Sequence, residues 1–356
     1  MFGNMKKLYH AILFTFHFSL FTLLVSCEKV SPIGVLVSGT GVEDRIKMSH
    51  EYYLLHKLEA NLHFADEMDE YTFLVGADSH VTKDIGRMRE MLENAMENED
   101  LLIAHLGDIA DTKAEYYILL EDLIDEYKLK YAEKYYKKTY IGDSNDPIQQ
   151  SLEDYYVYRD TVSGAIYNTD NIPYPFYPVV GNHDITHNGW ALWSNIFHSS
   201  FYDVFVVVDI DPFTLDHFIF LDTANGTMGE EQVKLIEQGV LDGKKYEENG
   251  YQFRNTFVFS HTNIFRPRSL EFASTFPREE TFFLLNQFNK WEVDIVFMGH
   301  VHKWDEQVVG GVQYLTLDSM CEANNPKPGD YLVRVHVRKD GTISWERVHM
   351  EYTPNN

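Results

Sequence analysis

Five short polar clusters carry residue types that can do metal chemistry, and each directly follows a run of apolar residues. The clusters are Asp78-Ser79-His80, Gly107-Asp108-Ile109-Ala110-Asp111, Gly181-Asn182-His183-Asp184, His261 and Gly299-His300-Val301-His302. Together they offer carboxylate, amide and imidazole donors without thiolate, a set suited to Mn, Fe or Zn and less to Ca. One such cluster is weak evidence in a chain with 16 histidines. Five clusters in comparable positions indicate a metal site.

The apolar runs that precede these clusters predict buried strands, because they are short and rich in β-branched and aromatic residues. The runs are Tyr71–Val75, Leu101–Leu106, Phe176–Val180, Thr256–Ser260 and Asp294–Met298. Helical periodicity lies between several of them, as in Ile85–Glu97 and Glu230–Leu241. This alternation predicts an α/β layered fold. Ligands of open α/β sheets bind outside the carboxyl ends of the strands, so the five clusters are expected to converge.

In chain order the clusters read D-x-H, G-D-x-x-D, G-N-H-D, H and G-H-x-H. This order resembles the signature of the calcineurin-like metallophosphoesterases, and the resemblance extends from Asp78 to His302. It implies a four-layer α/β/β/α sandwich and hydrolysis of a phosphomonoester or phosphodiester. It further implies a first metal ion held by Asp78, His80 and His302, a second held by Asn182, His261 and His300, and Asp108 bridging both.

The resemblance makes His183 the general acid at the leaving-group oxygen and Asp111 its orienting carboxylate. General acids of this kind typically contribute 10²–10⁴-fold to the rate. Two divalent cations roughly 3.5–4 Å apart form a clamp for in-line displacement, and a water that they share becomes available as hydroxide, the nucleophile. Asp184 has a weaker case, because it can equally cap the helix or turn that follows it.

A long spacer between the second and third motifs interrupts the rhythm of strands and helices. Residues from about 113 to 172 are expected to form an inserted helical hairpin: one amphipathic helix through Leu120–Tyr131, and a second helix beginning at Pro147 after the cap Asp146. The segment from Tyr116 to Tyr158 holds ten of the chain's 23 tyrosines. These tyrosines either face the substrate as a cap or pack the insertion onto the body, and packing is the favoured interpretation.

The N-terminus has the pattern of an export signal. Lys6-Lys7 precedes the apolar stretch Leu8–Val25, and Leu24-Val25-Ser26-Cys27 resembles the lipobox of bacterial lipoproteins. We therefore expect a signal peptide at 1–26 and a lipid on Cys27 that holds the exported protein on a membrane. The alternative is an uncleaved anchor helix. Residues 27–70 are expected to be a lead-in with one helix, from about Ile46 to Phe64, before the phosphoesterase domain at 71–356.

The formal net charge of −25 argues against binding of nucleic-acid polymers. The expected partner is instead a small phosphorylated substrate attracted by the two cations, and nucleotide-like compounds are among the candidates. With Cys27 acylated, Cys321 has no partner for a disulfide. Two other functions remain open: a surface-anchored protein that binds a metal or ligand without turnover, and a zinc-type amide hydrolase. The sequence leaves the oligomeric state open.

Three further residues are weaker candidates for the site. Asp222 ends another apolar run, and a role in a turn or cap is favoured over one behind the metal ligands. His187 follows His183 by four residues and is expected on the surface. Trp304 follows His302 and either lines the pocket or packs in the core.

Overall fold

The computed structural model describes residues 41–55, 62–141, 156–160, 165–168, 172–247, 250–265, 276–321 and 325–352. The expected signal peptide, Cys27 and the helix predicted from Pro147 lie outside these residues. Within the described part of the chain, no helix combines the length and apolar character that crossing a membrane requires.

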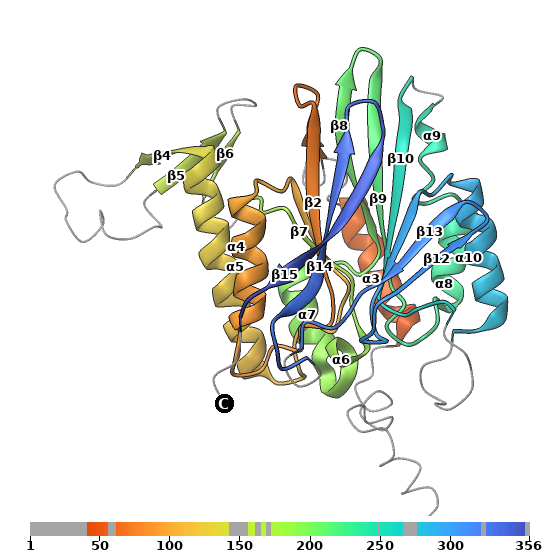
Figure 1. Cartoon of the computed structure of the whole chain (residues 1–356), viewed down its shortest axis with the longest axis horizontal. Coiled ribbons are helices and arrows are strands. Elements are labelled where there is room, and N and C mark those ends of the chain that lie inside the picture. Colours follow the sequence, from red (N-terminus) through yellow and green to blue (C-terminus); the bar gives the residue numbers. More distant parts are fainter. Residues whose placement is uncertain are drawn as a thin grey trace, which may run out of the picture.

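Two large sheets form the centre of the molecule (Figure 1). The seven-stranded sheet has the order β1 (Leu62–Phe64), β8 (Tyr202–Ile210), β9 (Phe213–Leu221), β10 (Gln252–Ser260), β11 (Ile295–Met298), β13 (Val312–Thr316) and β12 (Asp305–Val309). The five-stranded sheet has the order β15 (Ile343–Met350), β14 (Gly329–Arg338), β2 (Glu70–Gly76), β3 (Leu102–His105) and β7 (Phe176–Pro178). The apolar runs predicted as strands are all confirmed, with ends that differ by a few residues.

The two sheets pack face to face through an aromatic core. The ring of Phe73 on β2 lies 5.1 Å from Phe218 and 5.0 Å from Phe257, both on the other sheet. Edge-to-face pairs at these separations add stabilisation beyond the area that they bury. Alternate residues of β2 point the opposite way, so Leu74 packs against Met88 and Met91 of the helical layer instead.

Helices cover the outer face of each sheet and complete the four predicted layers. The five-stranded sheet is covered by α4 (Gly86–Glu97), α5 (Ala114–Tyr135) and α7 (Gly189–Phe197). The seven-stranded sheet is covered by α3 (Val42–Leu55), α8 (Gly229–Glu237) and α10 (Arg278–Lys290). Short elements complete the fold: α6 (Asn182–Ile185), the 3-10 turn η4 (Thr186–Asn188) and α9 (Lys244–Glu247). The α/β/β/α sandwich is thereby confirmed.

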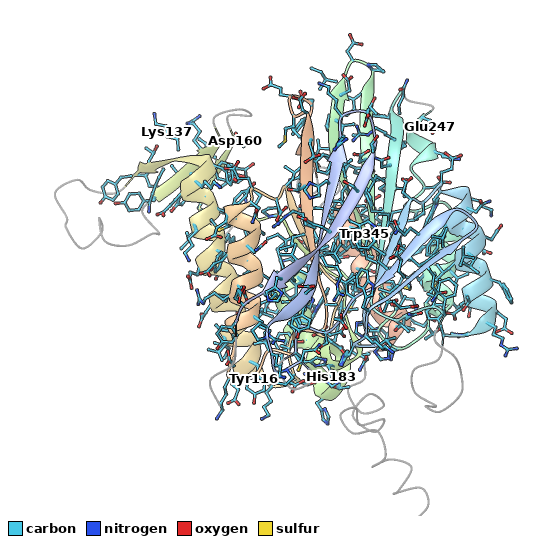
Figure 2. All side chains as sticks on the ribbon, viewed as in Figure 1. Tyr116, Lys137, Asp160, His183, Glu247 and Trp345 are labelled. Atoms are coloured by element: carbon cyan, nitrogen blue, oxygen red, sulfur yellow. The ribbon has the colours of Figure 1, made fainter. Side chains whose placement is uncertain are left out.

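The insertion differs from the predicted helical hairpin. Its first helix is α5, but a three-stranded antiparallel sheet follows: β4 (Tyr136–Tyr140), β5 (Tyr156–Asp160) and β6 (Ile166–Tyr167). Tyr140 lies opposite Tyr156, and such aromatic cross-strand pairs favour strands over helices. The 22 residues of α5 span about 33 Å, so this sheet lies far from the start of the helix. Figure 2 shows Lys137 and Asp160 at the opposite end of the molecule from His183.

The lead-in also differs from its prediction. The helix begins at Val42 and ends at Leu55, whereas Leu62–Phe64 forms β1. These three residues pair in parallel with Phe205–Val207 of β8, a tertiary contact that helical periodicity in the lead-in does not reveal. The prediction of a helix continuing to Phe64 was therefore wrong, and both elements of the lead-in are parts of the sandwich.

Candidate metal centre

The carboxyl ends of strands from both sheets meet at one edge of the sandwich and bring the predicted ligands together. Asp78 and His80 follow β2, Asp108 follows β3, His261 follows β10, and His300 and His302 follow β11. Asn182 begins α6, four residues after β7 ends at Pro178. Within this edge, two groups of potential ligand atoms share the carboxylate of Asp108. The residues predicted as ligands therefore lie together in two groups that share Asp108.

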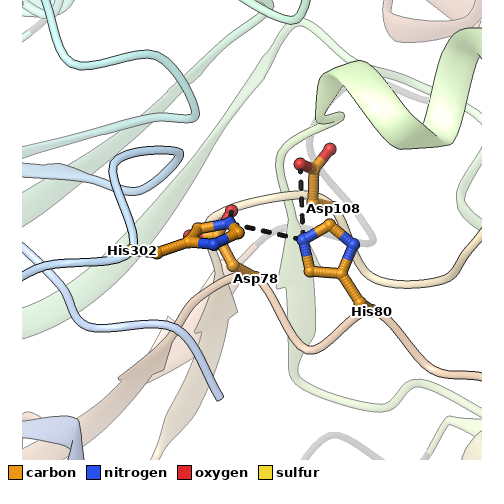
Figure 3. A group of neighbouring side chains, drawn as sticks. All are labelled: Asp78, His80, Asp108 and His302. Atoms are coloured by element: carbon orange, nitrogen blue, oxygen red, sulfur yellow. Dashed lines mark hydrogen bonds and ion pairs between the residues drawn. The ribbon is translucent and has the colours of Figure 1, made fainter. Parts of the chain in front are cut away.

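The first set is drawn in Figure 3 and contains Asp78, His80, Asp108 and His302. Nε2 of His302 lies 3.4 Å from Oδ1 of Asp78 and 3.4 Å from Nε2 of His80. Nε2 of His80 lies 3.7 Å from Oδ2 of Asp108. Both aspartates are buried, and the backbone N–H of His300 donates to the Asp78 carboxylate at 2.9 Å.

The second set consists of Asp108, Asn182, His261 and His300. Nε2 of His261 lies 2.9 Å from Oδ1 of Asn182, 3.1 Å from Nδ1 of His300 and 3.5 Å from Oδ2 of Asp108. Nδ1 of the same imidazole lies 2.7 Å from the carbonyl oxygen of Leu106. His261 is fully buried, so its ring is held rigidly at the centre of this set.

The tautomer of His261 makes a cation the natural occupant of this set. Because a carbonyl oxygen can only accept, Nδ1 carries the proton that it donates to Leu106. In the neutral ring Nε2 then presents a lone pair toward the oxygens of Asn182 and Asp108, which also accept. Lone pairs that face one another are repulsive unless a cation lies between them. The orientation of a ligating histidine by a backbone carbonyl is common behind metal sites.

Asp111 orients two histidines at once. Its Oδ1 lies 3.3 Å from Nδ1 of His80 and 3.4 Å from Nδ1 of His183. A proton on Nδ1 of His80 leaves its Nε2 lone pair directed at the first set of ligands. The rings of His80 and His183 are perpendicular, with centroids 4.5 Å apart. Asp111 therefore contacts the predicted general acid and also a residue predicted as a metal ligand, and the sequence did not indicate this second contact.

Asp184 has the capping role that was the alternative to a place in the site, and its contacts extend to a second loop. Its buried carboxylate accepts from the backbone N–H of Gly181 at 2.8 Å and of Ile109 at 3.1 Å, and from the hydroxyl of Tyr117 at 2.9 Å. Burial, with Asp108 nearby, raises the pKa of Asp184 to about 6. This residue ties the loop that carries Asp108 to the loop that carries Asn182.

The backbone at the site is strained. Five of the seven predicted ligands have φ in the left-handed region, which residues other than glycine rarely adopt. They are Asp78 (52°), His80 (43°), Asp108 (50°), His300 (69°) and His302 (56°). Each such residue costs about 1–3 kcal/mol, and such strain concentrates at functional sites. The glycines of the motifs predicted tight turns here, but nothing in the sequence indicated that the predicted ligands themselves have a strained backbone.

Ionisation in the cluster follows from its geometry. Burial alone would raise the pKa of Asp108, but the surrounding imidazoles, first His261 and then His183, outweigh it and hold this pKa well below its usual range. Burial alone would lower the pKa of His183, but Asp108 and then Asp111 outweigh it and raise the pKa to about 9. Asp108 is therefore anionic, the form in which a carboxylate binds a metal ion.

The weaker candidates lie outside this cluster. Asp222 forms a buried ion pair with Arg45, Nη2 to Oδ1 at 2.8 Å, and so stabilises the fold. His187 is exposed, as expected. Trp304 packs with its ring 5.5 Å from that of Trp345. Sequence reasoning missed Arg45, which lies 177 positions from its partner and carries no local signal.

Sequence reasoning also missed His105. It ends β3 just before the second motif and is fully buried, and no hydrogen-bond partner of its ring nitrogens lies in the described part of the chain. Burial lowers its pKa to about 3.

Comparisons with known proteins found no family model that matches the chain and no match among curated proteins. Solved structures do match. GAP50, the anchor in the inner membrane complex of Plasmodium, aligns over 80% of this chain and 90% of its own, at 14% identity and a TM-score of 0.43. A dimetal phosphatase from Danio rerio aligns over 75% and 93%, at 12% identity and 0.46. A putative 5'-nucleotidase from Staphylococcus aureus aligns over 81% of this chain and 55% of its own, at 11% identity and 0.42.

Proposed function

We propose that this chain is a metal-dependent phosphoesterase of the calcineurin-like type. The observation that carries the proposal is the arrangement of seven donor residues in two sets around the buried carboxylate of Asp108. When bound, two divalent cations would polarise the phosphoryl oxygens and supply a hydroxide nucleophile at neutral pH. Mn, Fe and Zn all suit these ligands.

The donor set fits such cations on chemical grounds. Two carboxylates, four imidazoles and one amide oxygen converge, and the Nε2 lone pair of His261 faces two oxygens that also accept. Only Asp78 and Asp108 among the ligands carry negative charge, so two divalent ions leave the site cationic. A cationic site attracts a phosphate even on a chain whose net charge is −25.

Two further residues act on the leaving group: His183 donates a proton, and Asp111 positions His183. Hydrolysis adds water across a P–O bond: the bond to the leaving group breaks, and its oxygen takes a proton. His183 is the residue placed to give that proton, with Nδ1 held by Asp111 and Nε2 left for the leaving group. The side chain of Asp111 is 41% exposed, so solvent reaches this side of the cluster and can restore the proton.

We also propose that the protein is exported and held on a membrane by a lipid on Cys27. The support is the pattern of Lys6-Lys7, the apolar stretch and Leu24-Val25-Ser26-Cys27. A cleaved, acylated N-terminus would be visible by mass spectrometry of the protein expressed in a bacterium. A mature N-terminus at any other residue would contradict this proposal.

The tyrosine-rich strands do not bear on the choice of substrate, because β4–β6 lie at the opposite end of the molecule from His183. The tyrosines of these three strands therefore give no support to a nucleotide-like substrate. Monoester and diester remain to be decided by assay.

The test is hydrolysis of matched chromogenic monoesters and diesters with added Mn²⁺, Zn²⁺ or chelator. We expect turnover that requires metal and is lost in Asp108→Ala, and the preferred ester defines the activity. Two bound ions without turnover on any phosphoester would instead favour a metal-binding protein. Turnover on amides alone would favour the amide hydrolase.

A further inference from the structure

Two strands of the seven-stranded sheet carry imidazole ligands, and each has an outer neighbour that carries none of the predicted ligands. His261 follows β10, and His300 and His302 follow β11. The strands lie in the order β9, β10, β11 and β13. Thr223 comes two residues after β9, and Ser319 comes three residues after β13. Both side chains are fully buried, and neither residue belongs to any of the five motifs.

The hydroxyl of Thr223 holds the chain on both sides of His261. Its Oγ1 accepts from the backbone N–H of Thr262 at 3.0 Å and lies 2.9 Å from Oγ of Ser260. Because a carbonyl oxygen can only accept, Ser260 gives its own proton to the carbonyl of Thr262 at 3.2 Å. Thr223 is then the donor to Ser260. This hydroxyl therefore uses both its proton and a lone pair beside a ligand of the second set.

The same contacts extend to His300. The carbonyl oxygen of His261 accepts from the backbone N–H of Gly299 at 3.0 Å, and Gly299 directly precedes His300. A shift of the end of β10 would therefore move both imidazoles of the second set.

Ser319 holds a ligand of the first set in a comparable way. Its Oγ donates to the carbonyl oxygen of Asp78 at 2.8 Å and accepts from the backbone N–H of Cys321 at 2.9 Å. Asp78 has a φ of 52°, and such a backbone conformation persists only where the surrounding structure imposes it. The hydrogen bond from Ser319 fixes the carbonyl of this strained residue.

Asp318, next to Ser319, contacts the other loop of the first set. Its Oδ1 accepts from the backbone N–H of Trp304 at 2.9 Å, two residues after His302. The loop after β13 thus contacts the chain at Asp78 and close to His302, whereas the loop after β9 contacts it on both sides of His261.

We propose that Thr223 and Ser319 are positioning residues that hold the two sets of ligands separately, Thr223 the second set and Ser319 the first. The inference rests on the proposed metal centre. Each hydroxyl acts through the backbone of a ligand or of its neighbours, and its removal leaves a buried N–H without an acceptor, so that the backbone must shift. Loss of a hydrogen bond behind a metal ligand lowers metal affinity by about 10–100-fold.

The test measures the Mn²⁺ affinity of one set at a time by calorimetric titration. His302→Ala removes a ligand of the first set, and Asn182→Ala removes a ligand of the second. In the His302→Ala background, Thr223→Val should weaken binding about 10–100-fold and Ser319→Ala much less. The order should be reversed in the Asn182→Ala background. Equal losses from both substitutions in both backgrounds would overturn the inference.

Matched substitutions separate the hydroxyl from the bulk of the side chain. Valine has nearly the shape of threonine without its hydroxyl, whereas Thr223→Ser keeps the hydroxyl and should keep the affinity of the unsubstituted protein. Equal weakening by Thr223→Val and Thr223→Ser would contradict the role of the hydroxyl. Thermal melting in chelator checks that each variant folds, and Ser319→Ala decides the inference by itself if Thr223→Val does not.

Tyr71→Phe is the control for loss of a buried hydroxyl elsewhere. The hydroxyl of Tyr71 donates to Asp216 at 2.7 Å, at the opposite end of β2 from Asp78. This variant should bind Mn²⁺ as the unsubstituted protein does, and a loss of affinity as large as in Thr223→Val would overturn the inference.

The same titrations separate this inference from the proposed function. If the unsubstituted protein binds two ions and neither Thr223→Val nor Ser319→Ala changes the affinity, the inference is overturned and the metal centre stands. If the unsubstituted protein binds neither Mn²⁺ nor Zn²⁺, the metal centre is overturned and the inference with it.

Discussion

Gly181 packs against Asp108, the residue that the two proposed sets of ligands share, so adding one methyl group there should disturb both sets. A Cβ at this position would lie 2.1 Å from the backbone nitrogen of Asp108 and 2.3 Å from its Oδ1. The φ of −104° and ψ of 175° at Gly181 suit any residue, so the backbone can accept alanine there without strain. The cost of Gly181→Ala therefore comes from the steric clash of its Cβ with Asp108. The clash is with backbone, which has no alternative rotamer to adopt.

The size of the effect follows from these distances. Real Cβ atoms essentially never approach closer than 3.0 Å, so the Asp108 loop must move by about 0.9 Å. Overpacking of this kind costs about 1–3 kcal/mol of stability. Asp108 is the shared ligand, and a displacement of about 1 Å at a catalytic group lowers rates by roughly 10²-fold. We therefore expect weaker metal binding and a rate lowered about a hundredfold, in a protein that still folds.

The assay is calorimetric titration with Mn²⁺, thermal melting and phosphoester turnover for Gly181→Ala beside Gly41→Ala. A Cβ at Gly41 meets nothing within 4 Å, and its cost as a residue preceding α3 stays below about 1 kcal/mol. We expect this control to bind metal as the unsubstituted protein does. If Gly181→Ala keeps full metal affinity and turnover, the close approach of the two loops is not what sets the ligand geometry.

Three further predictions concern the acid, the buried ion pair and pH. His183→Ala should lower turnover by about 10²–10⁴-fold, most for esters with poor leaving groups, while the amount of bound metal stays constant. The control is His187→Ala, at an exposed position. Equal losses for esters with good and poor leaving groups would contradict the role of His183 as general acid. Arg45→Met leaves the carboxylate of Asp222 buried without its cation and should lower the free energy of unfolding in urea by about 3–5 kcal/mol. The control is Lys130→Met, which breaks the exposed pair with Glu126 and should cost less than about 1 kcal/mol. Comparable losses of stability in the two variants would refute the prediction. The pKa of His105 is lowered to about 3 in the folded state, so below about pH 6.5 the unfolded state binds an extra proton. The free energy of unfolding should therefore decrease as the pH falls, by about 2 kcal/mol at pH 5. Measured in chelator between pH 7.5 and 5, His105→Leu should lose correspondingly less stability than the unsubstituted protein, and equal losses would exclude His105 as the cause.

The sequence sufficed to predict that the five motifs lie close together, because each motif follows a strand whose apolar pattern is plain. Thr256–Ser260 and Asp294–Met298 are short, buried and β-branched or aromatic, and their ends had to meet in a layered α/β fold. The alternation of strands and helices predicted a layered α/β fold, and the resemblance of the motifs to the metallophosphoesterases implied the four layers.

What the sequence did not reveal depends on contacts between distant residues. Arg45 reads as one charged residue on a helix, and only the fold shows that it pairs with Asp222 inside the protein. The Tyr136–Tyr140 segment follows a helix without a break, and its pairing with Tyr156–Asp160 decides that it is a strand. The left-handed backbone of Asp78 and His80 has no signature at the residues themselves, since neither is glycine.

The most direct test of the central claim is the rate of phosphoester hydrolysis by metal-free protein as Mn²⁺ is added in measured equivalents per chain. Two sets of ligands that share Asp108 predict that turnover rises until two equivalents are bound and then stays level. The same titration of Asp108→Ala should give no comparable rise. A plateau at one equivalent, or a rate that does not depend on metal, would contradict a two-metal phosphoesterase.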